Sequence, residues 1–150
     1  MKRVLFFILL VFAVTSIFSL VLIYEDFEGS TSFPDGWTQN SSYVQNNASN
    51  ANSGTYYAGM NRADDWIQLP NQDKPGDLTV WVRTSSDPDN WIMAIQKNTG
   101  SDWQNVKLVT ENGAGGEISN SYSQIEAQIR ENQNNVQIRF ILQSRSAGSC

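Results

Sequence analysis

Apolar and polar residues alternate along several short stretches of this chain. In DLTVWVRTS (77–85) every second residue from Leu78 to Val82 is apolar, and in NVQIRFILQS (135–144) the same holds from Val136 to Leu142. A period of two is typical of half-buried β-strands. The pattern predicts further strands at Leu22–Phe27, Tyr56–Met60, Trp66–Leu69, Trp91–Lys97 and Trp103–Val109.

Turn-forming residues separate these stretches. Pro, Gly, Asp and Asn cluster at 33–36, 73–76, 87–90, 98–100 and 112–116. Strands at short intervals with turns between them predict an all-β fold, which we expect to be a jelly-roll β-sandwich of two antiparallel sheets. Ser41–Gly54 is polar and predicts a long loop, whereas Tyr122–Arg130 fits a strand and a helix almost equally well.

The N-terminus has the pattern of an export segment. Lys2 and Arg3 precede an almost unbroken apolar run from Val4 to Ile23. This pattern predicts a signal peptide over residues 1–20, or a retained membrane-anchor helix, since about 20 apolar residues span a bilayer. The remaining domain, 21–150, is then secreted or displayed at the cell surface, and it contacts a membrane only if the anchor is retained.

Composition excludes several kinds of chemistry. The 150 residues include no His and one Cys, which rules out a Ser-His-Asp triad, an internal disulfide and a cysteine metal cluster. The 10 basic and 15 acidic residues give a net charge of −5, which becomes −7 once Lys2 and Arg3 are removed with the signal. A charge of this sign argues against nucleic acid as a partner. We expect no enzymatic activity.

Five motifs occur in order along the domain. They are YEDFEG (24–29) with FPDGW (33–37), SGTYYA (53–58), DWIQLP (65–70), DLTVWV (77–82) and VQIRF (136–140). Together they resemble the choice-of-anchor J and cleaved-adhesin domain family of secreted bacterial proteins, which is related in shape to MAM-type jelly rolls. In that family a further strand usually follows a phrase like SAGS (146–149), so we expect the chain to be a fragment or to lack its closing strand.

Asp26 and Glu28 are the candidate metal ligands. They flank Phe27, so in a strand both carboxylates lie on one face. The family resemblance implies a structural Ca²⁺ near this strand, and carboxylate oxygens are the ligands that Ca²⁺ prefers. The alternative is a pair of solvated charges on an edge strand.

Three tryptophans are the candidate ligand-binding residues. Exposed indoles stack on sugar rings, and Trp91 and Trp103 each begin a predicted strand directly after a polar loop, where a position at the rim is expected. Trp81 alternates with core residues, and either burial or exposure fits its position. Trp37 and Trp66 fall in motifs that predict core packing.

These features favour a secreted, non-catalytic binding or adhesion module that recognises extracellular carbohydrate or a cell-surface protein. The alternative is an accessory structural domain of a larger secreted hydrolase. The ligand is not identifiable from the sequence.

Overall fold

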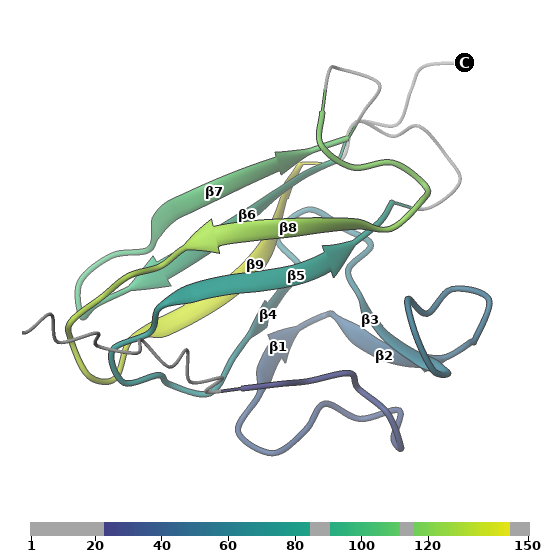
Figure 1. Ribbon diagram of the computed structural model, residues 1–150, viewed down its shortest axis with the longest axis horizontal. Coiled ribbons are helices and arrows are strands. Elements are labelled where there is room, and N and C mark those ends of the chain that lie inside the picture. Colours follow the sequence, from purple (N-terminus) through teal and green to yellow (C-terminus); the bar gives the residue numbers. More distant parts are fainter. Residues whose placement is uncertain (1–22, 85–90, 112–115, 145–150) are drawn as a thin grey trace, which may run out of the picture.

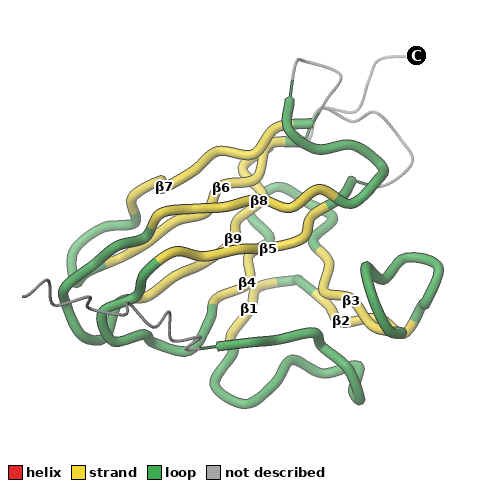
Figure 2. The backbone as a smooth tube through the Cα atoms, in the orientation of Figure 1, coloured by secondary structure: helices red, strands yellow, loops and turns green. Residues whose placement is uncertain are grey.

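The computed structural model describes residues 23–84, 91–111 and 116–144, and the chain in these ranges is built from β-strands without a helix (Figure 2). The strands are β1 (Thr38–Asn40), β2 (Tyr43–Asn46), β3 (Tyr56–Gly59), β4 (Trp66–Gln68), β5 (Asp77–Val82), β6 (Ile92–Asn98), β7 (Gln104–Thr110), β8 (Ser123–Gln128) and β9 (Gln137–Ser144). The expected signal or anchor helix at 1–20 lies outside these ranges. Within them, no helix is long and apolar enough to cross a membrane.

The strands form three antiparallel sheets that make two layers. One sheet has five strands in the order β1-β4-β9-β6-β7, and two smaller sheets pair β2 with β3 and β5 with β8. The β5–β8 pair lies in front of β6 and β9, with β7 beside β8 in this view (Figure 1). The fold is therefore an all-β sandwich, as the alternation of apolar residues predicts.

The core fills the space between the five-stranded sheet and the β5–β8 pair. Ile95 on β6 and Val109 on β7 are fully buried there, and Ile125 on β8 is 4% exposed. Leu78 and Val80 on β5 pack against the same cluster. The alternation along each strand places these apolar side chains on the inner side of their layer.

Residues 122–130, which fit a strand and a helix almost equally well, form β8 and its continuation. Ser123–Gln128 pairs with β5, with Ile125 opposite Val80 and Ala127 opposite Leu78. Ile125, Ala127 and Ile129 are all buried, whereas the residues between them are exposed. The segment is therefore a strand rather than a helix, because it covers one side of the core and its side chains alternate between buried and exposed.

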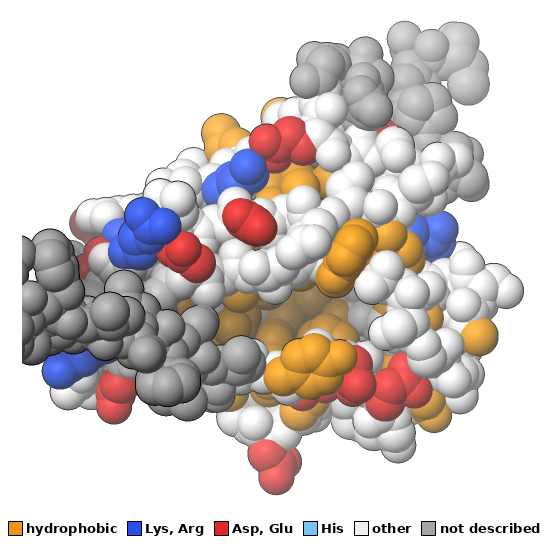
Figure 3. Space-filling model, in the orientation of Figure 1, with side chains coloured by type: hydrophobic (Ala, Val, Ile, Leu, Met, Phe, Trp, Pro, Cys, Tyr) orange, Lys and Arg blue, Asp and Glu red, His pale blue; other side chains and the backbone are white. Residues whose placement is uncertain are grey.

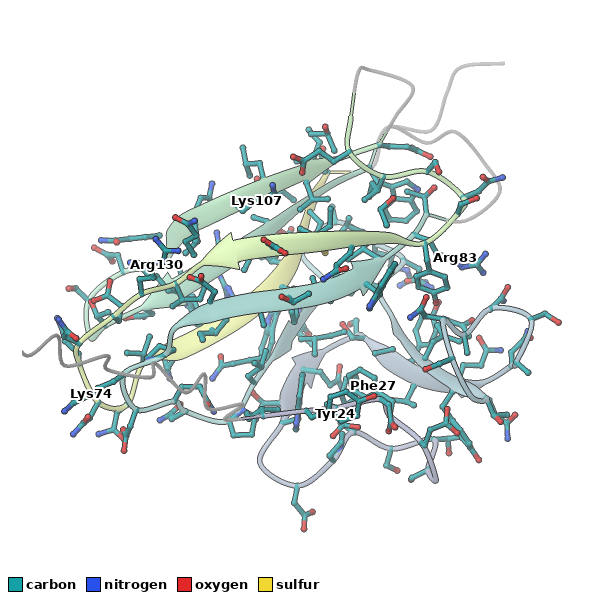
Figure 4. The ribbon with its side chains drawn as sticks, viewed as in Figure 1. Tyr24, Phe27, Lys74, Arg83, Lys107 and Arg130 are labelled. Atoms are coloured by element: carbon teal, nitrogen blue, oxygen red, sulfur yellow. The ribbon has the colours of Figure 1, made fainter. Side chains whose placement is uncertain are left out.

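The predicted strand at Leu22–Phe27 is wrong over its described part, residues 23–27, which are irregular. The Glu25 carboxylate accepts a hydrogen bond from the Phe27 amide at 2.6 Å, and Phe27 has a φ of 61°. This local turn is incompatible with an extended strand. It brings the Phe27 ring edge-on to Phe33 and Trp37 (Figure 4), and Ile23 of the same segment packs against the core.

The long loop predicted at Ser41–Gly54 is shorter than expected, because its first part forms β2. Val44 is 6% exposed, and Tyr43 lies opposite Gly59 of β3. The Tyr43 ring rests on the glycine backbone, where an added Cβ would lie 2.5 Å from the ring. Only two apolar residues mark this strand, which is too few for a periodic pattern.

A bidentate ion pair joins β5 to the residue after the buried Ile129. Arg130 donates from Nε to Asp77 Oδ1 at 2.8 Å and from Nη2 to Oδ2 at 3.0 Å. These hydrogen bonds hold the pKa of the Asp77 carboxyl below its ordinary value of 3.8. Because both groups are solvent-exposed, the contribution to stability is small.

We expect Arg130→Gln to raise the Asp77 pKa toward its ordinary value, as measured by carboxyl-carbon NMR during acid titration. Because the folded-state pKa is lowered, the pair stabilises the fold above the unfolded-state pKa, and this contribution is lost as the pH falls through the folded-state pKa. An Asp77 pKa that does not move in the variant contradicts the pairing.

Candidate functional site

The two layers present very different surfaces to solvent. The side formed by β5 and β8 carries charged side chains (Figure 3), including the Lys107–Glu117 ion pair at 3.0 Å and the Arg130–Asp77 pair. The four charges of these two pairs already have protein partners. The opposite side is the solvent-facing side of the five-stranded sheet, which we call the outer face.

Strand register defines two rows of side chains across the outer face. Ile95 and Ile138 point into the core, so their neighbours Gln96 and Arg139 point outward. Tracing the paired residues across all five strands gives an apolar row and a polar row. The apolar row is Trp66, Ile141, Ala94 and Leu108, with Asn40 as its one polar member at the β1 edge. The polar row is Thr38, Gln68, Arg139, Gln96 and Asn105.

The polar row is organised by hydrogen bonds among long side chains. Arg139 Nε donates to Gln96 Oε1 at 2.8 Å, and Gln96 Nε2 donates to Asn105 Oδ1 at 2.8 Å. Gln143 Nε2 donates to the same Asn105 oxygen at 3.3 Å. These contacts fix the side chains on β9, β6 and β7 relative to one another.

Trp103 completes this network at the edge of the sheet. It precedes β7, two residues before Asn105, and the guanidinium carbon of Arg139 lies 4.0 Å from the centre of its ring. A cation over an indole at this distance is an attractive contact. Trp103, one of the three tryptophans that the sequence predicts for ligand binding, thus lies half-buried beside the polar row in contact with Arg139.

The apolar row provides a surface on which a flat ligand can lie. Ala94 is fully buried and lies between Ile141 and Leu108 in the row. Leu108 is 49% exposed at the β7 end, and Trp66 is partly exposed on β4. Aromatic and aliphatic surface beside fixed amide groups is an arrangement suited to sugar rings, which have apolar faces and polar rims.

The other two predicted tryptophans lie elsewhere. Trp91 is only 8% exposed, and its backbone N–H donates to the Glu111 carboxylate at 3.2 Å. Burial of this degree leaves no indole face for a ligand, so the structure removes Trp91 from the surface position expected for it. Trp81 is 50% exposed on the β5–β8 side, opposite Gln124. The structure therefore does not bring the three tryptophans together.

Asp26 and Glu28 contact backbone amides. Asp26 Oδ1 accepts from the Glu28 amide at 3.1 Å, and Glu28 Oε1 accepts from the amides of Thr55 and Tyr56 at 2.7 and 2.9 Å. Glu28 thereby joins the N-terminal segment to the start of β3. Over the ranges that the structure describes, no three acidic, cysteine or histidine side chains are grouped to hold a metal. Calcium at this position stays a prediction.

Thermal melting tests the calcium prediction. If Asp26 and Glu28 bind Ca²⁺, excess Ca²⁺ raises the melting temperature of the full chain above its value in EDTA, since a ligand of the folded state stabilises it. In Glu28→Gln this difference is expected to shrink, while the amide oxygen keeps an acceptor for Thr55 and Tyr56. Equal melting temperatures in Ca²⁺ and EDTA would contradict the prediction.

The residues that sequence reasoning missed are Arg139, Gln96, Asn105 and Gln143. Arg139 and Gln143 alternate with core residues on β9, so their outward direction is visible in the sequence. The pairing of β9 with β6, and of β6 with β7, is not visible in the sequence. Trp66 was expected in the core, but it lies in a row of the outer face.

Comparison with known proteins supports the fold. No family model matches the chain, and no curated protein gives a significant match. Among solved structures, the chain is similar to "Structure of TmCBM61 in complex with beta-1,4-galactotriose at 1.4 A resolution", with a TM-score of 0.51 and 13% identity. The match covers 75% of this chain and 81% of that chain. At this identity the likeness supports the β-sandwich fold alone. The resemblance to the choice-of-anchor J family stays a prediction.

Proposed function

We propose that this chain is a non-catalytic carbohydrate-binding module that acts outside the cell, with the outer face as its binding surface. The observation that carries the proposal is the pair of rows: an apolar row suited to the face of a sugar ring lies beside a polar row suited to its hydroxyl groups. The structural neighbour, whose title names a complex with β-1,4-galactotriose, adds a reason to choose carbohydrate over protein.

The chemistry of the polar row favours binding over catalysis. Its side chains from Gln68 to Asn105 are amides and one guanidinium, which donate and accept hydrogen bonds but do not transfer protons near neutral pH. Glycoside hydrolysis requires two carboxyl groups facing one bond. Neither row contains Asp or Glu, so the two rows do not supply the groups for that reaction.

A glycan array with the full chain tests the proposal. We expect binding to a subset of polysaccharides, and Leu108→Asp should weaken it because a charge replaces apolar surface in the row. Thr79→Asp places the same charge on the exposed side of β5 and should leave binding unchanged. No binding to any glycan, or equal loss in both variants, would contradict the proposal.

A further inference from the structure

Arg139 occupies the middle of the polar row, on β9. Its Nε donates to Gln96, and its guanidinium lies against the Trp103 ring. The contacts with Gln96 on β6 and with Trp103 before β7 therefore set the plane of the guanidinium. A guanidinium held in this way loses little further freedom when it binds a ligand.

Arg139 has no carboxylate partner in the part of the chain that the structure describes. Three ion pairs occur there, formed by Lys97, Lys107 and Arg130, and Arg139 is in none of them. Asp102 is next to Trp103 in the chain, yet it is solvent-exposed and forms no ion pair with Arg139. Over the same ranges, the terminal nitrogens Nη1 and Nη2 form no hydrogen bond with another residue.

The absence of a partner is notable because the chain is acidic. It carries 15 Asp and Glu residues, yet the ten positions of the two rows hold none. Arg139 is also partly buried, and burial lowers the pKa of its guanidinium. A desolvated cation with only neutral neighbours is stabilised by an anion that binds it.

The geometry points to a sugar that carries a carboxylate, a uronic acid unit of an acidic polysaccharide, as the ligand of the outer face. The carboxylate accepts two hydrogen bonds from the terminal nitrogens of Arg139, in the forked arrangement that guanidinium groups form with carboxylates. The ring then lies toward the apolar row, and Gln68 and Asn105 are in reach of its hydroxyl groups. This inference rests on the proposed function and adds the charge of the ligand.

Isothermal titration calorimetry with matched trisaccharides tests the inference. The probes are trigalacturonate, triglucuronate and trimannuronate, each as the free acid and as its methyl ester, together with neutral galactotriose and a sulfated galactotriose. We expect at least one uronate to bind about tenfold or more tightly than its own methyl ester. The ester keeps the ring and removes the charge, so this difference requires no variant.

Two variants connect this preference to Arg139. In Arg139→Gln the acid and its ester should bind equally. Arg139→Lys should keep part of the preference for the acid, since the positive charge remains but the forked guanidinium is lost. Circular dichroism and thermal melting check that both variants fold. Equal binding of acid and ester by the unchanged protein overturns the inference, and so does tighter binding of the sulfated sugar. If neutral galactotriose or another glycan still binds, the proposed function stands; if nothing on the array binds, both fail.

Discussion

Replacing Trp103 with alanine is expected to weaken glycan binding about 30-fold or more. Aromatic anchors at binding surfaces typically contribute about 2 kcal/mol, which corresponds to this change in Kd. The loss has two parts here, because Trp103 offers its own surface and also holds the guanidinium of Arg139 at 4.0 Å. Calorimetry with the glycan that the array selects gives the change directly.

Trp81→Ala is the matched control for this prediction. Trp81 is 50% exposed and lies on β5, on the opposite side of the sandwich. Its removal should leave Kd unchanged within about twofold. If Trp81→Ala abolishes binding and Trp103→Ala does not, the ligand lies on the β5–β8 side and the outer face is not the site.

Ile95→Ala is expected to lower the free energy of unfolding by about 3–4 kcal/mol, the usual cost of truncating a large buried aliphatic residue. Ile95 lies on β6, the strand between β9 and β7, and none of its surface is exposed. Urea unfolding of the full chain followed by tryptophan fluorescence measures the change, with an unchanged denaturant slope indicating that the unfolding reaction is the same.

Leu108→Ala on the neighbouring strand is the control for the core variant. Leu108 is 49% exposed on the outer face, so its truncation should cost no more than about 0.5 kcal/mol. The two variants thus test which side of the five-stranded sheet faces the core. A loss at Leu108 equal to the loss at Ile95 would contradict the assignment of the two sides.

The alternation of apolar residues predicted most of the strands because burial on one side of a layer leaves a period of two. It predicted β5 and β9 closely, and it placed Arg139 on the side opposite Ile138. It failed at residues 23–27, where a hydrogen bond to the Glu25 carboxylate and a positive φ at Phe27 form a turn. Such local hydrogen bonds leave no periodic signal.

The site was less predictable than the fold because it is assembled by pairing distant strands. Trp103 was recognised from its place after a polar loop, but its partner Arg139 is 36 positions further along the chain. The two meet only because β6 pairs with both β7 and β9. Trp91 follows a polar stretch in the same way as Trp103, yet it is buried. Position after a loop therefore does not distinguish a surface indole from a core one.

The most direct test of the outer face as the binding surface is a titration of the ¹⁵N-labelled chain with the selected glycan, followed by two-dimensional NMR. If the glycan binds the outer face, the largest shift changes occur at Gln68, Gln96, Asn105 and Arg139 and at the indole N–H of Trp103. Largest changes at Thr79, Trp81, Gln124 and Glu126, on the β5–β8 side, would contradict binding at the outer face.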